Sequence, residues 1–188
     1  MAIKKISTAV LISGRGSNLK NLIFFSKKKN SPIIIKLVIS DNSRAKGLIY
    51  AKKNFIKFKV IKNKDRKIFE NKIKNELLHN KIKFICLAGF MKILSKNFVN
   101  KFKNKIINIH PSLLPKYKGL NTHEKVLKNK DKFSGCTVHF VNENLDSGKI
   151  ILQKKIKVLK NDNLASLKKK VLMIEHKVYP KAIIKILK

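Results

Sequence analysis

The stretch STAVLISGRGSNLKNLIFFS, residues 7–26, predicts the fold of this chain. Its first part, 7–13, is a nearly unbroken apolar run, which is typical of a strand that helices cover on both faces. Gly14 and Gly16 then allow a tight turn. A helix is expected to follow, capped by Ser17 or Asn18 and ending at Ser26. A buried strand that turns through glycines into a helix indicates an α/β domain with a parallel sheet.

The same alternation of apolar and amphipathic segments continues along the chain. Strands are expected at 33–40, 58–61, 84–88, 106–109, 136–141 and 150–158, and helices at 65–79, 95–102 and 164–187. Asp65 and Ser95 are the expected caps of two of these helices, and Pro180 is expected to bend the last one. No repeat or shift in composition marks a second domain. We therefore predict one domain, 1–188, with a doubly wound, Rossmann-like α/β fold, a mostly parallel sheet and helices on both faces.

The formal net charge of +35 invites comparison with nucleic-acid-binding proteins. Only Arg15, Arg44 and Arg66 among the 45 basic residues are arginines, whereas base readout and bidentate phosphate contacts favour arginine. The lysines are spread along the whole chain and accompany many isoleucines and asparagines, as a coding bias toward A and T would produce. We expect no specific nucleic-acid partner, although the positive field would attract small anions.

Two cysteines, Cys86 and Cys136, lie inside apolar runs, which indicates buried thiols in a reducing compartment. No apolar stretch reaches about 18 residues, and the amino terminus lacks the cleavage pattern of an export signal. We therefore expect a cytoplasmic protein without a membrane partner. The histidines, cysteines and carboxylates show no metal-ligand spacing, so no metal is expected.

In a doubly wound sheet, ligands bind at the carboxyl ends of the strands. The segment SGRGSN, residues 13–18, follows the first strand, and its backbone N–H groups would form an anion site at the start of a helix. It matches neither a Walker loop nor a full dinucleotide fingerprint. Phosphate binding and a plain turn from strand to helix both remain open interpretations of this segment.

The segment NIHPSLLPKYKGLNTH, residues 108–123, follows a later strand. Asn108 and His110 are two residues apart, so their side chains would point to the same face at the strand end. An amide donor and an imidazole aimed at one spot would stabilise an oxyanion and move a proton, as acyl transfer requires. Pro111 is expected to end the strand, and the loop through Gly119 is a candidate substrate flap.

Asp146 stands in the segment VNENLDSGKI, residues 141–150. It would either start an ordinary turn or face His110, hold the imidazole and raise its pKa so that it acts as an acid at neutral pH. The role of His139 stays open, because it alternates with Val138 and Phe140 and would equally well line the sheet.

Five segments in order, LISGRGSNLKNLI, LAGFMKILS, NIHPSLLPKYKGLNTH, VHFVNENLDSGKIILQ and EHKVYP, resemble the phosphoribosylglycinamide formyltransferase family of folate-dependent enzymes. The resemblance covers nearly the whole chain. Methionyl-tRNA formyltransferases resemble its middle part, but they carry a further domain for which 188 residues leave no room.

The resemblance implies roles for individual residues. Asn108, His110 and Asp146 match the catalytic trio, in the half of the domain that also binds folate. The expected ribonucleotide contacts, mainly in the amino-terminal half, are Gly14, Arg15, Gly16, Ser17, Asn18 and Glu175. The expected folate contacts are Met91, Lys92, Ile93, Leu94, Asn108, Val141, Asn142, Glu143 and Asn144.

Three positions depart from the family pattern. Asn121 stands where many relatives have histidine, and Leu172 stands where some have a basic residue near the phosphate. Lys92 replaces an arginine of some relatives, so a bidentate contact with the folate tail would become a point-charge contact. Any role for the first two positions is in doubt.

The implied activity is transfer of a formyl group from 10-formyltetrahydrofolate to 5'-phosphoribosylglycinamide in purine biosynthesis, with no metal and small molecules as the only partners. A monomer or weak homodimer is expected. Two other functions are alternatives: hydrolysis of formyltetrahydrofolate, in which water replaces the amine, and a nucleic-acid-binding module. The phosphate loop speaks against the hydrolase, and the trio speaks against a pure binding module.

Overall fold

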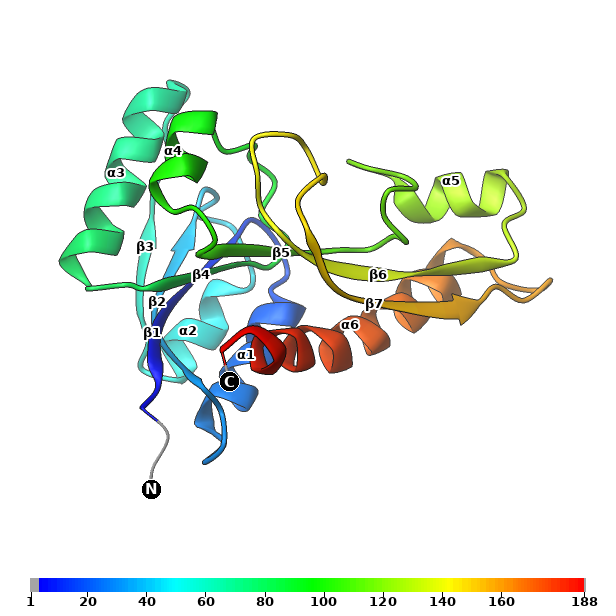
Figure 1. The fold of residues 1–188 in the computed structure, drawn as a ribbon, viewed down its shortest axis with the longest axis horizontal. Helices are drawn as coiled ribbons and strands as arrows, with labels where there is room; N and C mark the ends of the chain where they lie inside the picture. The colour runs from blue at the N-terminus through cyan, green and yellow to red at the C-terminus, as the bar shows by residue number, and fades with distance from the viewer. Residues whose placement is uncertain (1–3, 188) are drawn as a thin grey trace.

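A computed structural model describes residues 4–187, and these form a seven-stranded sheet with helices around it (Figure 1). The strands are β1 (Ile6–Ile12), β2 (Ile33–Ser40), β3 (Lys57–Val60), β4 (Phe84–Leu87), β5 (Ile106–His110), β6 (Phe133–Phe140) and β7 (Ile150–Lys157). The helices are α1 (Ser17–Lys27), α2 (Leu48–Lys53), α3 (Arg66–His79), α4 (Lys96–Lys101), α5 (Thr122–Lys128) and α6 (Leu164–Leu187).

The order of the strands places a switch point in the middle of the sheet. The order is β3-β2-β1-β4-β5-β6-β7, so the chain builds outward from β1 on one side and returns to its other side at β4. The first five strands in this order pair in parallel, and β6 and β7 pair antiparallel at one edge. This confirms the predicted doubly wound, mostly parallel fold. Ligands of such sheets bind beside the switch point, at the carboxyl ends of the strands.

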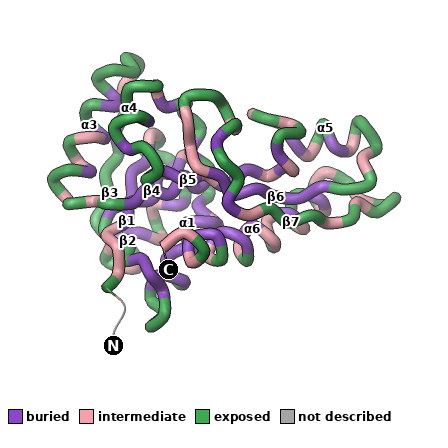
Figure 2. Tube along the Cα trace, viewed as in Figure 1, coloured by how far each residue is buried: buried purple, intermediate pink, exposed green. Residues whose placement is uncertain are grey.

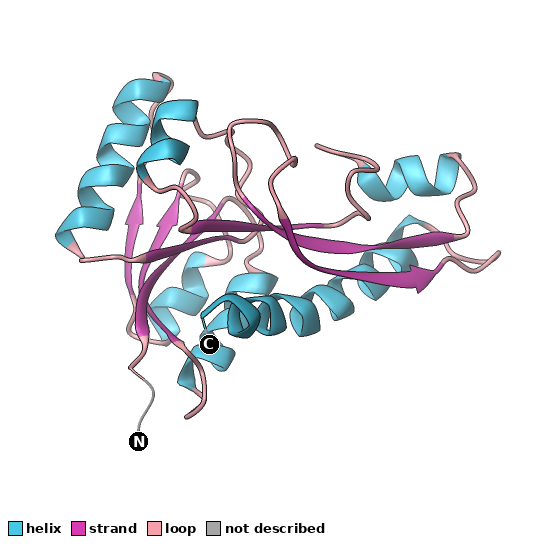
Figure 3. Cartoon of the chain, viewed as in Figure 1, coloured by secondary structure: helices cyan, strands magenta, loops and turns pink. Residues whose placement is uncertain are grey.

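Side chains of the central strands are buried alternately on the two faces of the sheet. On β1, Val10 and Ile12 pack in the core shared with α1 and α6, while Ala9 and Leu11 pack in the core shared with α3 and α4. Figure 3 shows these helix pairs on opposite sides of the sheet, and Figure 2 shows the buried segments gathered in the strands between them. The unbroken apolar runs of the sequence therefore reflect two covered faces.

The predicted capping residues are correct for helices α3 and α4 and wrong for helix α1. Side-chain oxygens of Asp65 and Ser95 accept from the N–H groups of Ile68 and Phe98, at 2.8 and 3.1 Å, which confirms both predicted caps. The predicted cap of α1 by Ser17 or Asn18 is wrong. Both residues lie inside the helix, and the cap position is Gly16, with φ of 74° and no capping side chain.

Helix α6 crosses the sheet beside α1 and packs on β6 and β7. Pro180, at which a bend is expected, lies inside this helix, and the helix continues on both sides. A proline within a helix removes the hydrogen bond to the carbonyl four residues earlier, here His176. The side chain of Asn21 on α1 donates to that carbonyl at 2.7 Å. A polar contact between the two helices therefore replaces the missing backbone bond.

Candidate active site

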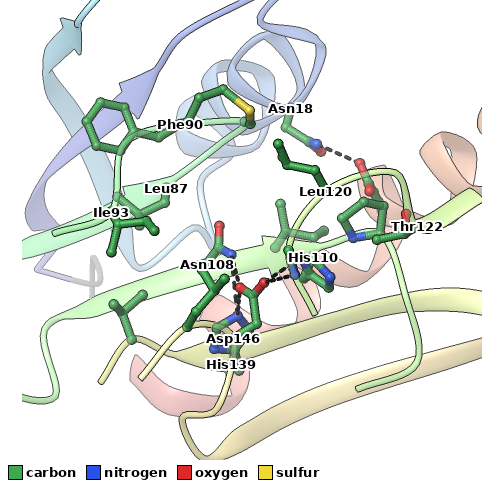
Figure 4. A pocket seen from close by; sticks show the side chains of 18 of the residues that line it. Asn18, Leu87, Phe90, Ile93, Asn108, His110, Leu120, Thr122, His139 and Asp146 are labelled. Carbon is green, nitrogen blue, oxygen red and sulfur yellow. Dashed lines mark hydrogen bonds and ion pairs between the residues drawn. The ribbon is translucent and has the colours of Figure 1, made fainter. Parts of the chain in front are cut away.

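A cavity of about 520 Å³ opens at the carboxyl ends of the central strands. Its walls come from the loop after β1, the loop after β4, the end of β5, the loop between β6 and β7, and one face of α6 (Figure 4). Most of the predicted site residues line it: Arg15, Ser17, Asn18, Met91, Lys92, Ile93, Leu94, Asn108, His110, Val141, Asn142, Glu143, Asn144, Asp146 and Glu175. Gly14 and Gly16 do not line the cavity and instead shape the loop beside it.

The centre of the cavity holds Asn108, His110 and Asp146. Asn108 and His110 lie among the last three residues of strand β5, which ends immediately before Pro111 as the sequence predicts. Nδ1 of His110 lies 3.3 Å from Oδ2 of Asp146, and Nδ2 of Asn108 donates to Oδ1 of Asp146 at 3.5 Å. The sequence placed Asp146 either in a turn or opposite His110. The structure shows that it faces His110, and Figure 4 shows the three side chains together.

Asp146 is held as an anion by its surroundings. Its backbone has φ of 47°, a left-handed conformation that aspartate adopts more readily than most residues. Its buried carboxylate accepts from the N–H of Gly119 at 2.9 Å. Burial opposes the charge, but contacts with His139, Gly119 and His110 outweigh it and lower the pKa of Asp146. The residue therefore presents a negative charge to His110.

The predicted rise in the pKa of His110 is not what its environment produces. Burial is the largest influence on its pKa and lowers it, while the Tyr117 carbonyl and Asp146 raise the pKa and His139 and Lys125 lower it. The net pKa of His110 is lowered. The expected upward effect of Asp146 is present, but the predicted net rise is wrong because His110 is only 5% exposed and loses solvation.

His139, whose role the sequence left open, lies against the trio. Antiparallel pairing of β5 with β6 places it directly opposite Asn108. Its Nε2 is 3.3 Å from Nδ2 of Asn108 and 3.6 Å from Oδ1 of Asp146, and its Nδ1 is 2.9 Å from the Phe140 carbonyl. Because a carbonyl only accepts, the hydrogen is on Nδ1, and Nε2 accepts from Asn108. His139 therefore orients the amide of Asn108.

One end of the cavity is polar and rigid. Nδ2 of Asn18, in the first turn of α1, donates to Oε2 of Glu175 on α6 at 2.7 Å, and both side chains are buried. Burial raises the pKa of Glu175 to about 7, partly opposed by the hydrogen bond from Asn18. The first turn of α1 contains no acidic residue, so its free N–H groups keep their attraction for anions.

Close backbone packing fixes the glycine loop at this end. A Cβ on Gly16 would lie 2.4 Å from Cα of Gly47, and Gly47 donates from its N–H to the carbonyl of Gly14 at 3.0 Å. The left-handed φ of Gly16 adds a second reason for glycine at this position. The segment 13–18 is thus tightly packed at Gly16, while Gly14 and Arg15 are exposed.

The opposite end of the cavity is apolar and more exposed. Met91 and Ile93 are large apolar residues with 61% and 59% of their surface accessible, and they line the cavity there. Leu94 lies buried beneath them. An apolar slot of this kind suits a flat ring system with few charges.

Charged side chains border this apolar end. Nζ of Lys96 lies 2.8 Å from Oε2 of Glu143 across the cavity edge. Nζ of Lys92 lies 4.9 Å from the centre of the Phe69 ring and donates to the Asn63 carbonyl at 3.4 Å. Lys92 is therefore an exposed ammonium at the rim, with contacts to Phe69 and Asn63.

Two residues that depart from the family pattern also line the cavity. Asn121 has φ of 59° at the start of α5, a left-handed conformation that asparagine tolerates, and Leu172 adds an apolar surface on α6. Sequence reasoning missed His123 and Lys168, which line the same region. His123 ends the segment 108–123 but was given no role there, and no local motif marks Lys168; the packing of α5 against α6 brings both to the cavity.

Among residues 4–187, no group of three or more histidine, cysteine, aspartate or glutamate side chains is arranged to hold a metal ion. Within the same residues, no helix has both the length and the apolar character needed to cross a membrane.

The sequence model of the formyl transferase family matches residues 6–183. A phosphoribosylglycinamide formyltransferase of Haemophilus influenzae is 41% identical over 184 residues, which cover 95% of this chain and 84% of that protein. The crystal structure of a phosphoribosylglycinamide formyltransferase from Brucella melitensis superimposes with a TM-score of 0.93 at 38% identity, covering 98% of this chain and 96% of that one.

Larger proteins contain a related segment. A trifunctional purine biosynthetic protein adenosine-3 of Chironomus tentans is 46% identical over 188 residues, which cover 97% of this chain. The chain spans only 14% of the length of that relative. The similarity therefore concerns one part of the trifunctional protein.

Proposed function

The chain belongs to the formyl transferase family, with the phosphoribosylglycinamide formyltransferases among its relatives, and from this membership and the cavity we propose a specific reaction. The formyl group of 10-formyltetrahydrofolate is transferred to the amine of 5'-phosphoribosylglycinamide. The products are formylglycinamide ribonucleotide and tetrahydrofolate, on the route of purine biosynthesis.

The observation that carries this proposal is the position of the trio between two unlike ends of one cavity. Asn108, His110 and Asp146 lie at the centre, the anion-attracting start of α1 lies at one end, and the apolar slot lies at the other. A phosphorylated acceptor fits the first end, and the flat ring of a folate donor fits the second. The reacting groups of both substrates would then meet at the trio.

The proposed reaction is a direct transfer. The amine attacks the formyl carbon, a new C–N bond forms, and the bond between that carbon and the folate nitrogen breaks. Asn108 and protonated His110 donate hydrogen bonds to the oxyanion of the tetrahedral intermediate. The proton lost by the amine is balanced by the proton gained by the folate nitrogen, and Asp146 supports this transfer by favouring the charged form of His110. No step requires a metal.

At the ribonucleotide end, backbone N–H groups of residues 14–18 hold the phosphate, with Arg15 beside them. Glu175 accepts from the acceptor substrate while Asn18 holds it in place. At the other end, residues 91–94 and 141–144 enclose the folate ring.

We propose further that residues 1–188 act as one formyltransferase domain, in the cytoplasm, as a monomer or weak homodimer with small-molecule partners. One continuous sheet through residues 6–157 supports the proposal of one domain.

The test is a spectroscopic assay of the purified protein with 10-formyltetrahydrofolate, with and without 5'-phosphoribosylglycinamide. The proposal expects tetrahydrofolate and formylated ribonucleotide to appear in equal amounts, and only when both substrates are present. Folate turnover that ignores the ribonucleotide would identify a hydrolase and overturn the proposal.

A further inference from the structure

A backbone carbonyl determines which nitrogen of His110 carries hydrogen. Nε2 of His110 lies 2.8 Å from the carbonyl oxygen of Tyr117. A carbonyl oxygen can only accept, so Nε2 must carry the hydrogen whether the ring is neutral or charged. Nδ1 faces Oδ2 of Asp146 at 3.3 Å. The nitrogen that gains and loses a proton is therefore the one beside the carboxylate.

Tyr117 is held in an unusual conformation by contacts outside the cavity. Its φ is 56°, which is rare for a bulky residue and persists only where the surroundings impose it. Its hydroxyl donates to Oδ2 of Asp131 at 2.7 Å and accepts from Nδ2 of Asn129 at 2.7 Å. Asp131 also binds Nζ of Lys116 at 2.7 Å. Neither Tyr117 nor Asp131 lines the cavity.

We propose that Asp131 is a positioning residue, which holds Tyr117 so that its carbonyl fixes His110 in the Nε2–H form and leaves Nδ1 to act on the substrate. The proposal rests on the proposed formyl transfer for its catalytic meaning. In that reaction Nδ1–H donates to the oxyanion, and Nδ1 exchanges its proton beside Asp146. Asp131 acts on this step through Tyr117 and His110 and touches no substrate.

Asp131 is suited to this role because it is an anion with only 16% of its side chain accessible. Burial opposes ionisation, but hydrogen bonds from Lys116 and Tyr117 outweigh it and lower the pKa of Asp131. A charged acceptor makes a stronger hydrogen bond with the tyrosine hydroxyl than a neutral one.

The groups that face His110 give the direction of the expected pH effect. Asp146 approaches from the loop after β6, His139 from β6, and Lys125 and His123 from α5, besides the Tyr117 carbonyl. The Tyr117 carbonyl and Asp146 raise the pKa of His110, against burial, His139 and Lys125. If Tyr117 is released, the pKa of His110 should fall.

The first test measures the tautomer directly and needs no activity. Long-range 1H–15N spectra of histidine-labelled protein, recorded where the rings are neutral, should show His110 as the Nε2–H form. His139 is a matched internal control, because its Nδ1 lies 2.9 Å from the Phe140 carbonyl and requires the opposite form. Variants His110→Asn and His139→Asn assign the two signals. An Nδ1–H signal from His110 overturns the proposal even if formyl transfer is fully active.

The second test separates positioning from general loop stability. Tyr117→Phe and Asp131→Ala should each lower kcat about 10- to 100-fold, as loss of one hydrogen bond to a charged group would, with the KM of both substrates unchanged. The double variant should resemble either single variant. In each variant the limb of the pH profile that depends on His110 should move to lower pH.

Lys116→Gln is the control for this second test, since it removes the ion pair with Asp131 and the cation–π contact with the Tyr117 ring but leaves the hydrogen bond between Asp131 and Tyr117. Lys116 is more than half exposed, so kcat should change less than twofold. If Lys116→Gln behaves like Asp131→Ala, or if the pH limb stays in place in Tyr117→Phe, the positioning role is overturned. Should Asp131→Ala fail to fold, Tyr117→Phe decides alone. Absence of formyl transfer in the unsubstituted protein would count against the proposed function and leave the spectroscopic test intact.

Discussion

The two ends of the cavity are built in different ways. The end at α1 depends on backbone packing and on the buried pair of Asn18 and Glu175, while the end at Met91 and Ile93 depends on exposed apolar side chains. Backbone packing tolerates little change, because a single added carbon meets another main chain. Exposed side chains can shift rotamers at low cost. We therefore expect substitutions at the first end to alter binding and stability together, and substitutions at the second end to alter binding alone.

The largest effect is expected between the two ends, at Asp146. Asp146→Asn keeps the shape of the side chain but removes the charge that favours protonated His110. We expect kcat to fall by about 10²- to 10⁴-fold, the range of general acid-base contributions, with the KM of both substrates nearly unchanged. Because Asp146 raises the pKa of His110, the His110 limb of the pH profile should move to lower pH.

Asp146→Asn should leave both ends of the cavity unchanged, so its effect belongs to the trio alone. Steady-state kinetics across pH and a thermal melt are the two measurements. A fully active variant with an unshifted pH profile would mean that Asp146 has only a local structural role in the turn.

The next largest effect is expected at the packed end, from Gly16→Ala. The new Cβ would lie 2.4 Å from Cα of Gly47 and would occupy a left-handed conformation. Strain of this kind costs on the order of 1–3 kcal/mol of unfolding free energy. The KM for the ribonucleotide should rise much more than the KM for the folate, because the loop that holds the phosphate is displaced.

Gly14→Ala is the matched control for Gly16→Ala, since no atom lies within 4 Å of its added Cβ. Urea unfolding and kinetics with each substrate varied are the measurements. Equal changes in the two KM values would contradict the placement of the phosphate at this loop.

At the same end, Glu175→Gln should change the pH dependence of stability. The pKa of Glu175 is raised from 4.5 to about 7, so the folded protein binds more protons than the unfolded chain between these values. The free energy of unfolding should therefore fall as pH rises from 4.5 to about 7, by an amount on the order of 3 kcal/mol. Glutamine cannot ionise, so the variant should lack this part of the pH dependence.

Urea unfolding at several pH values measures this difference between the variant and the unsubstituted protein. Glu124→Gln removes a half-exposed carboxylate of α5 and serves as the control. If both variants show the same pH dependence, the buried charge of Glu175 is not its source. At the ribonucleotide end, Glu175→Gln should also raise the KM for the ribonucleotide.

The smallest effect is expected at the exposed end, from Lys96→Met. The ion pair of Lys96 with Glu143 raises the pKa of the lysine, but the lysine side chain is 67% accessible. Exposed pairs contribute little and are screened by salt, so the KM for the folate should change by less than about threefold. The change should vanish at high ionic strength, and the melting temperature should stay constant. A large, salt-independent loss of stability would mean that this end is as rigid as the other.

Much of the fold could be predicted because its cause is local. The strands follow from apolar runs, and the caps of α3 and α4 follow from Asp65 and Ser95. Helices α2 and α5 were not predicted, because six or seven residues are too few to establish a helical period and, unlike the equally short α4, neither begins at a capping side chain. The cap of α1 was misassigned because the contact between Gly16 and Gly47 joins distant segments.

The trio was found because Asn108 and His110 end a strand and Asp146 stands in a recognisable turn. The contribution of His139 was not found, since it depends on which residue the antiparallel strand places opposite Asn108. The contact of Tyr117 with His110 leaves no trace in the sequence, because any residue type supplies a carbonyl. The net pKa of His110 was misjudged because a sequence does not show how completely a side chain loses water.

The site can be completed only after helix α6, which follows all the strands in the chain, has been synthesised. The Tyr179 hydroxyl of this helix donates to the carbonyl of Leu87, the last residue of β4, at 2.9 Å and lies 3.3 Å from the carbonyl of Ile107 in β5, and its Glu175 accepts from Asn18, 157 positions earlier. A nascent chain that has emerged only to residue 160 already carries Asn108, His110 and Asp146, yet one sheet face lacks its cover and Asn18 lacks its partner. Catalytic competence should therefore appear late and abruptly during translation, when the final helix docks.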